Sequence, residues 1–242
     1  MNERNHAHRH GRLAGLIKRA SGVIFDFDGP MCRLFPDGTA PQAEEIKEAM
    51  LRAGGVRLPG TMTALRDSHA ILQELRRDTS ATAGLAADLV TRAEYVAVQT
   101  ARASDHLHAV VTQLAAAGVG LAVASNNDAG PISAFLNQHG LAGHFGNRVY
   151  GRDPRALDRM KPDPDSVLRA SAGLGLKPEF CLMVGDKVTD LEAAQAAGTL
   201  FLGCTDNEAE GSQMAKLGAD AVVDSLAPLL DTVLTLTAQG NH

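Results

Sequence analysis

The chain has 242 residues, of which 45% are hydrophobic, and these values suit a packed globular protein with a sizeable core. Its formal net charge of -5 at pH 7 gives no electrostatic reason to expect nucleic acid or an anionic membrane as a partner. The composition therefore favours chemistry on a small molecule.

The N-terminal stretch carries His6, His8 and His10 and lacks the apolar segment of a signal peptide. One interpretation of these histidines is metal binding, but a solvated polar end is the simpler one and the one we expect. Residues 12–20 are predicted to form a short basic helix that packs against the core. No stretch approaches the about 20 apolar residues of a membrane span.

The cysteines are too few and too scattered for a disulfide framework or a structural zinc site. They are Cys32, Cys181 and Cys204. Such a pattern is typical of a reducing compartment. We therefore expect a soluble cytoplasmic protein, either a monomer or a homodimer, with no nucleic-acid or membrane partner.

The first predicted strand covers residues 23–27 and lies within the stretch GVIFDFDGP, residues 22–30. Its β-branched and aromatic residues favour a strand that is buried on both faces, where acids are rare. Asp26 and Asp28 nevertheless stand at its end, directly before a turn at Gly29. Two carboxylates in that position indicate a functional site.

The segment that follows, residues 33–104, is predicted to be an all-helical insert. Helical patterns cover residues 41–53, 67–77 and 82–102, and no convincing strand interrupts them. The insert therefore separates the first strand from the rest of the predicted sheet.

Strands and helices alternate in the remainder of the chain. Strands are predicted at residues 121–124, 180–184, 200–203 and 221–223, and helices at residues 105–118, 164–173 and 191–198. This alternation favours parallel βαβ units. The predicted fold class is α/β, with a Rossmann-like parallel sheet that carries helices on both faces. Residues 1–32 and 105–242 form this core, and residues 33–104 form the insert.

Polar motifs stand where ligands bind in an open parallel sheet, beyond the carboxyl ends of the strands. One of them spans the end of the first predicted strand, two directly follow later predicted strands, and the fourth precedes a helix. They are DFDGP at residues 26–30, SNND at 125–128, KPDP at 161–164 and GDKVTD at 185–190. Together they supply carboxylates, a hydroxyl group and an ammonium group.

This ordered set, DFDGP, LAVASNN, KPDP and GDKVTD, resembles the motifs of the haloacid dehalogenase superfamily over residues 22–234. The similarity is to the phosphatase branch that carries a helical cap, so the insert at residues 33–104 is expected to be an α-helical cap domain. The resemblance implies a Mg²⁺-dependent phosphatase that acts on a small phosphorylated metabolite, of the phosphoglycolate or sugar-phosphate type.

The resemblance also implies roles for individual residues. Asp26 is similar to the family nucleophile, which forms an aspartyl-phosphate intermediate. Asp28 is similar to the general acid that protonates the leaving oxygen and later activates water. Ser125, the backbone N–H of Asn126 and Lys161 resemble the groups that bind the phosphoryl oxygens.

A Mg²⁺ ion is the implied cofactor, since it prefers hard oxygen ligands and neutralises phosphate charge. Its implied ligands are the Asp26 carboxylate, the Asp28 backbone carbonyl and Asp186, with Asp190 supporting them. In this family the residue after the ligand Asp186 is usually small and hydroxylated, but here it is Lys187. Three interpretations remain: Lys187 neutralises substrate charge, competes with Mg²⁺, or points to solvent.

Pro30 also departs from the family pattern, because Thr or Val usually follows the glycine, and it removes a backbone N–H at the exit into the insert.

Substrate choice is expected to lie in the cap, where Arg33, Arg57 and His69 are candidate specificity residues. Haloalkanoate dehalogenases of this superfamily lack the second aspartate of the first motif, so the presence of Asp28 argues against that reaction. Two alternatives stay open, a phosphomutase of the same family and a non-catalytic phosphate-binding or regulatory protein on this fold.

Overall fold

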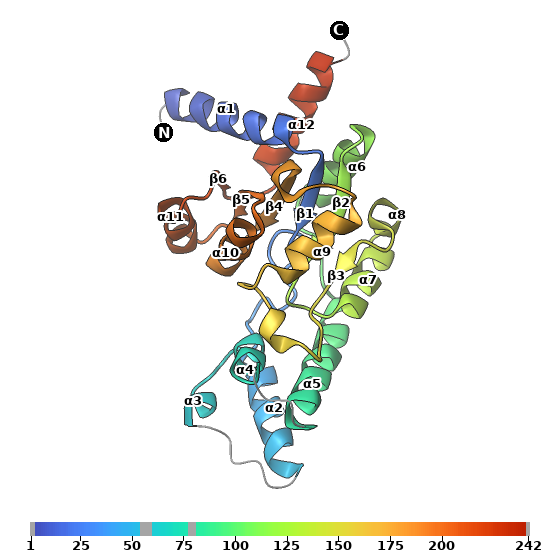
Figure 1. Cartoon of the computed structure of the whole chain (residues 1–242), viewed down its shortest axis with the longest axis vertical. Coiled ribbons are helices and arrows are strands. Elements are labelled where there is room, and N and C mark those ends of the chain that lie inside the picture. Colours follow the sequence, from blue (N-terminus) through green and yellow to red (C-terminus); the bar gives the residue numbers. More distant parts are fainter. Residues whose placement is uncertain (1–2, 54–59, 77–80, 241–242) are drawn as a thin grey trace.

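A single sheet of parallel strands organises the protein, in a computed structural model that describes residues 3–53, 60–76 and 81–240 (Figure 1). The strands are β1 (Gly22–Phe25), β2 (Gly120–Ala124), β3 (Val149–Tyr150), β4 (Cys181–Gly185), β5 (Leu200–Cys204) and β6 (Ala221–Val223). Among the described residues their order is β3-β2-β1-β4-β5-β6, and every neighbouring pair is parallel. The predicted α/β fold class is therefore confirmed.

Helices cover both faces of this sheet. One face packs against α1 (Glu3–Arg19), α6 (Leu107–Ala116), α7 (Ala129–Gln138), α8 (Ala142–Phe145) and α12 (Ala227–Gly240). The other packs against α9 (Asp165–Gly173), α10 (Val188–Ala197) and α11 (Glu208–Lys216). In β1, Val23 and Phe25 contribute to the first hydrophobic cluster and Ile24 to the second. Successive side chains point to opposite faces, so a strand buried on both sides needs an unbroken apolar run.

Between β1 and α6 the described residues form helices without a strand. These are α2 (Ala40–Arg52), α3 (Gly60–Thr63), α4 (Ser68–Glu74) and α5 (Ala81–Val98). Their buried apolar side chains form a hydrophobic cluster of their own. Leu157 and Met160, from the segment between β3 and α9, also belong to it. In Figure 1 these helices lie together beyond the carboxyl ends of the strands. The exact bounds of a cap domain at residues 33–104 stay a prediction.

Several elements differ from the sequence prediction in extent. The first strand ends at Phe25 rather than residue 27, because the backbone N–H of Asp26 makes the last bond to Val184 before the chain turns. The two-residue strand β3 was not predicted, since a run that short carries no periodicity. The basic N-terminal helix is longer than expected, and its Leu13 and Leu16 are buried against the core as predicted.

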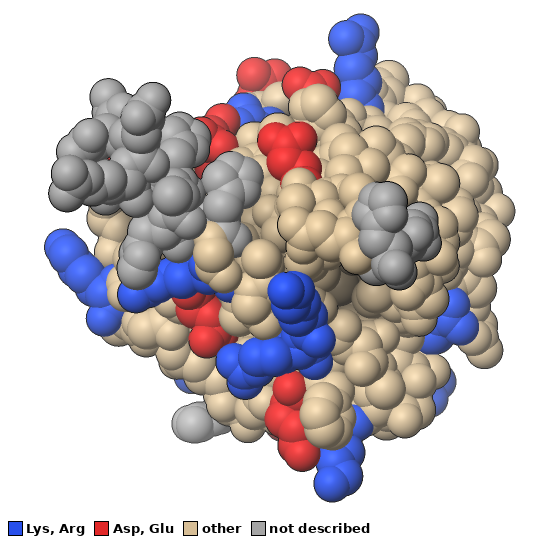
Figure 2. Space-filling model, turned by 90° about the horizontal axis from the view of Figure 1, so that it is seen from above, with Lys and Arg blue, Asp and Glu red and all other residues tan. Residues whose placement is uncertain are grey.

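The surface carries charges of both signs. Figure 2 looks onto the molecule from above the view of Figure 1, and on that face basic and acidic side chains are interspersed among uncharged ones. Within the described ranges, no helix is both long enough and apolar enough to cross a bilayer. The side chains of His6, His8 and His10 lie outside the described residues, so the expectation for them stays a prediction.

Candidate active site

The central strands bring three of the polar motifs to one edge of the sheet. β1 lies between β2 and β4, in register, so their carboxyl ends stand side by side. Asp26 follows β1, Ser125 follows β2 and Asp186 follows β4. Side chains that are far apart in sequence therefore meet because the strands that carry them are hydrogen-bonded neighbours.

Lys161 reaches the same edge from the loop before α9 and is only 2% exposed. Its Nζ donates to Asp26 Oδ1 at 2.8 Å, to Asp190 Oδ1 at 2.5 Å and to the carbonyl of Ala124 at 3.2 Å. Burial alone would lower the pKa of Lys161, but the charges of Asp190 and Asp26 outweigh it and raise the pKa. The side chain is therefore a buried ammonium between two carboxylates.

Asp190, in the first turn of α10, uses both carboxylate oxygens within the protein. Oδ1 accepts from Lys161, and Oδ2 accepts the backbone N–H groups of Asp186 and Lys187, each at 3.1 Å. A helix N-terminus favours a carboxylate in this position. Asp190 therefore holds the turn that carries Asp186.

Asp26, Asp186 and Asp190 form a cluster that suits a metal ion. One oxygen from each lies within 4.8 Å of the others. Asp186 Oδ1 is buried and has no hydrogen-bond partner among the described residues. Burial, followed by the charges of Asp190 and Asp26, raises the pKa of Asp186 to about 8. An orphaned buried oxygen among repelling carboxylates fits a hard divalent cation such as Mg²⁺.

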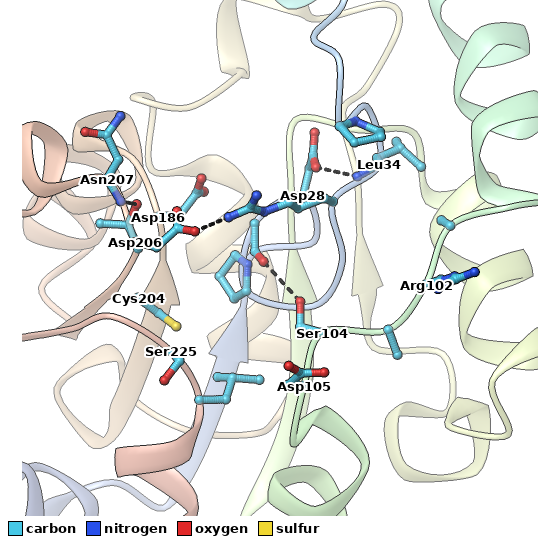
Figure 3. A pocket seen from close by; sticks show the side chains of 18 of the residues that line it. Asp28, Leu34, Arg102, Ser104, Asp105, Asp186, Cys204, Asp206, Asn207 and Ser225 are labelled. Carbon is cyan, nitrogen blue, oxygen red and sulfur yellow. Dashed lines mark hydrogen bonds and ion pairs between the residues drawn. The ribbon is translucent and has the colours of Figure 1, made fainter.

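Asp28 lies two residues beyond Asp26, and its Oδ1 accepts the backbone N–H of Leu34 at 2.8 Å (Figure 3). The pKa of Asp28 is raised, mainly by burial. The hydrogen bond from Leu34 opposes this effect, and the negative charge of Asp26 adds to it. A carboxyl group with a raised pKa retains a proton more readily, which suits a proton donor.

Gly29 allows the loop after β1 to approach the loop after β4. Its φ is +128°, a conformation that residues with a side chain rarely adopt, and a methyl group here would collide with the carboxyl group of Asp186. The glycine is therefore required by both the backbone and the adjacent acid.

The loop after β2 and the loop that carries Lys161 hold each other. The backbone N–H of Lys161 donates to Asn126 Oδ1 at 2.7 Å, and Asn126 Nδ2 donates to the Lys161 carbonyl at 3.1 Å. Ser125 Oγ donates to Asn127 Oδ1 at 3.1 Å. These bonds fix a hydroxyl group and an ammonium group beside Asp26.

Two cavities meet at Asp28. The smaller, of about 40 Å³, is lined by Asp26, Ser125, Asn126, Lys161 and His69 besides Asp28. The larger, of about 940 Å³, extends from Asp28 and Asp186 towards the loops after β5 and β6. Figure 3 shows the labelled side chains of the larger cavity, with Asp28 and Asp186 near one another.

The predicted specificity residues lie in different places. His69, on α4, lines the smaller cavity, whereas Arg33 lines the larger one and forms an exposed ion pair with Asp206. Arg57 lies outside the described residues, so its role stays a prediction. Lys187 is exposed to solvent and also lines both cavities.

The sequence analysis did not single out two buried charged residues beside the site, Glu94 and Arg152. Arg152 Nη1 lies 2.6 Å from Glu94 Oε1, and neither side chain is exposed. The sequence does carry a signal for Glu94, because it falls four residues after Val90 and four before Val98, both buried on the apolar face of α5. An acid on such a face needs a partner.

Comparisons with known proteins agree with this geometry. The family model described as "Hydrolase: haloacid dehalogenase-like hydrolase" matches residues 20–198. The phosphoglycolate phosphatase of Vibrio vulnificus (strain CMCP6) is 30% identical over 221 residues, which cover 88% of this chain and 95% of the relative. That of Rhodospirillum rubrum is 33% identical over 224 residues, covering 86% of this chain and 89% of the relative.

The fold is also similar to that of solved structures. One is the crystal structure of a HAD family hydrolase from Deinococcus radiodurans R1 with bound phosphate and sodium. It is 27% identical, has a TM-score of 0.57 and covers 87% of this chain and 93% of that chain.

Proposed function

The chain belongs to the haloacid dehalogenase-like hydrolases and hydrolyses phosphoric monoesters; we propose that it does so with Mg²⁺ through an aspartyl-phosphate intermediate on Asp26. The observation that carries this proposal is the arrangement around Asp26. The carboxylate stands at the end of the central strand, with Lys161 at 2.8 Å and Asp186 and Asp28 beside it.

In the proposed reaction, a carboxylate oxygen of Asp26 attacks phosphorus, and the bond from phosphorus to the leaving oxygen breaks. Asp28 gives its proton to that oxygen, so the product leaves as an alcohol. Asp28, now a carboxylate, takes a proton from water as the water attacks phosphorus and releases inorganic phosphate from Asp26. The raised pKa of Asp28 supports the first of these roles.

We propose that the phosphoryl oxygens are bound by Ser125 Oγ, the backbone N–H of Asn126 and the Lys161 ammonium. These groups line the smaller cavity together with Asp26. Fixed donors of this kind stabilise charge in the transition state because they need not reorganise during the reaction. The bonds between Asn126 and Lys161 support this assignment, since they hold two of the three groups in place.

Mg²⁺ would be held by the Asp26 carboxylate, the Asp28 backbone carbonyl and Asp186, and it would neutralise phosphoryl charge. The unpartnered Oδ1 of Asp186 supports its part in this set. Asp190 is proposed to support the ligands rather than bind the ion, because both of its oxygens already accept hydrogen bonds.

The proposed substrate is a small phosphorylated metabolite of the phosphoglycolate or sugar-phosphate type. Two relatives named phosphoglycolate phosphatase support the former. Residues 33–104 would act as the cap, with Arg33, Arg57 and His69 as candidate contacts to the substrate. We also propose a cytoplasmic location, which the free, buried thiols of all three cysteines support.

Release of inorganic phosphate from a panel of phosphorylated metabolites, with Mg²⁺ and with a chelator, tests the proposal. We expect turnover of 2-phosphoglycolate or of a few sugar phosphates, dependent on Mg²⁺ and lost in Asp26→Asn. This variant keeps the shape of the side chain and removes the nucleophile.

The same panel separates the alternatives. Conversion of one sugar phosphate to its isomer without phosphate release would identify a phosphomutase. No reaction from a folded protein that still binds phosphate would identify a non-catalytic binding protein.

A further inference from the structure

Glu94, on the last helix of the insert, is fully buried and accepts hydrogen bonds from three separate segments. Oε1 receives Asn127 Nδ2 and His69 Nε2 at 3.1 Å each and Arg152 Nη1 at 2.6 Å. Oε2 receives the backbone N–H of Asp128 at 3.0 Å and Arg152 Nη2 at 3.2 Å. One carboxylate thus connects α5 to α4, to the loop after β2 and to the loop after β3.

Arg152 makes a second set of contacts to the same loop. Its Nη1 donates to the carbonyl of Asn126 at 2.9 Å, and its backbone N–H donates to the carbonyl of Asn127 at 2.9 Å. The neighbouring Gly151 permits this approach, because a methyl group there would lie 2.6 Å from the Asn127 carbonyl oxygen. The guanidinium therefore bridges Glu94 and the backbone of the loop after β2, residues 125–128, which is called the phosphate-binding loop below because Ser125 and Asn126 are assigned to the phosphoryl group.

These contacts lead directly to groups that line the smaller cavity. Asn127, held by Glu94, accepts the hydroxyl of Ser125, and Asn126, held by Arg152, pairs with Lys161. His69 lines the cavity itself. Because burying an ion pair costs desolvation that an apolar pair would avoid, stability alone does not explain Glu94 and Arg152 at this position.

We propose that Glu94 and Arg152 are positioning residues that lock the helical insert onto the phosphate-binding loop, fixing Ser125 and Asn126 and presenting His69 to the phosphoryl group. This inference rests on the proposed function, since it assigns the smaller cavity to phosphate. It assigns one of the candidate substrate contacts, His69, to the phosphoryl group and adds two residues, Glu94 and Arg152, that act through others.

The bond to Glu94 also defines the proton on His69. A carboxylate only accepts hydrogen bonds, so His69 Nε2 must donate, and in the neutral ring the proton lies on Nε2. This bond holds the ring in one orientation at the cavity wall.

The test compares Glu94→Gln, Arg152→Lys and His69→Asn with Glu48→Gln, an exposed acid on α2 that serves as the matched control. Glu94→Gln removes the charge with little change of shape, and Arg152→Lys keeps the charge and loses the planar fork. For each Mg²⁺-loaded protein, kcat and KM are measured on the best substrate of the panel. Calorimetry gives the Kd for inorganic phosphate, and the thermal unfolding midpoint is recorded.

We expect kcat/KM to fall about ten- to hundredfold in Glu94→Gln and Arg152→Lys, because small displacements of positioned groups have effects of this size. The Kd for phosphate should rise about tenfold or more in His69→Asn, with a smaller fall of the unfolding midpoint than in Glu94→Gln, because only one of the hydrogen bonds to Glu94 is lost. The control should match the wild type in all these measurements.

The inference is overturned if kcat, KM and the phosphate Kd are unchanged in the variants while only their unfolding midpoints fall, because the pair is then merely structural. Should Glu94→Gln fail to fold, Arg152→Lys and His69→Asn decide by the same readouts. A wild type that binds phosphate without turnover contradicts the proposed reaction alone, and the phosphate Kd values still decide this inference. A wild type that neither turns over substrate nor binds phosphate overturns both.

Discussion

The ammonium of Lys161 lies 2.8 Å from Oδ1 of Asp26, although 135 residues separate the two in sequence. Asp190 Oδ1 lies on the same ammonium at 2.5 Å. Lys161 thus neutralises the proposed nucleophile before any substrate binds, and it also fixes its position.

Replacing Lys161 with methionine should therefore affect both stability and activity. Removing one partner of a buried ion pair leaves uncompensated charge and destabilises a protein by about 3–5 kcal/mol. We expect a loss of this order in urea unfolding, with phosphate release abolished. Lys177→Met, in an exposed pair with Glu179, is the control and should change neither. Full activity in Lys161→Met would contradict the assignment.

Gly29→Ala should damage the metal site more than it damages the fold. Its positive φ costs about 1–3 kcal/mol for any residue with a side chain, and the added methyl group would also displace Asp186. Gly38→Ala is a matched control, since Gly38 has a φ of +79° with open space around it. We expect Gly29→Ala to lose more stability than Gly38→Ala, measured in urea, because only its methyl group meets Asp186, and only Gly29→Ala to bind Mg²⁺ about tenfold more weakly or worse. Equal Mg²⁺ affinities would show that the contact is unimportant.

The sequence predicted the parts of the site that follow strands, for a physical reason. Asp26, Ser125 and Asp186 each end a buried apolar run, and parallel neighbours place such ends together. Lys161 was predicted through the family resemblance, because a lysine in a loop has no periodic pattern that indicates burial. Its two carboxylate partners became visible only in three dimensions.

Glu94 and Arg152 could not be paired from the sequence. Arg152 directly follows Gly151 after β3, a strand of two residues that leaves no recognisable pattern. Glu94 does interrupt the apolar face of α5, but this pattern does not indicate which basic residue forms the ion pair with it. The contact depends on how the insert sits on the core, and local periodicity carries no information on that arrangement.

The ion pair between Arg33 and Asp206 provides a test of the substrate prediction. Both side chains are 67% exposed, so the pair should contribute little to stability. Asp206→Asn releases the guanidinium towards the larger cavity, and we expect a lower KM for 2-phosphoglycolate, which carries a carboxylate besides its phosphate. Arg33→Met should raise that KM several-fold. Substrates with an uncharged leaving group are the control, and equal effects on both classes would exclude Arg33 as a specificity residue.

Glu94 should make stability depend on pH in the acid range. Burial alone would raise its pKa, but the hydrogen bond with His69 and the charge of Arg152 lower it from 4.5 to about 2. The unfolded chain therefore binds the proton more readily, and this contribution to stability is present above pH 4.5 and is lost as the pH falls towards 2. The free energy of unfolding of the wild type should exceed that of Glu94→Gln by about 3 kcal/mol at neutral pH. Urea unfolding from pH 7 to pH 2 should show that difference disappear, whereas a constant difference would contradict the lowered pKa.

Asp186→Asn should separate metal binding from folding. In the metal-free protein the pKa of Asp186 is raised to about 8 from 3.8, so the folded state binds this proton more tightly than the unfolded chain. Stability should consequently fall as the pH rises from 4 to 8, and Asp186→Asn should remove that slope.

Added Mg²⁺ should offset the loss of stability that the ionised Asp186 causes beside Asp190 and Asp26 in the wild type. A ligand that binds only the folded state stabilises it by about 2.7 kcal/mol at a hundred times its Kd. We expect the thermal unfolding midpoint at pH 8 to rise with Mg²⁺ in the wild type and to stay constant in Asp186→Asn. Asp88→Asn, an exposed acid on α5, is the control and should respond as the wild type does. A Mg²⁺-dependent rise of equal size in Asp186→Asn would place the ion elsewhere, since the unpartnered oxygen that motivates the site would then be unnecessary for binding.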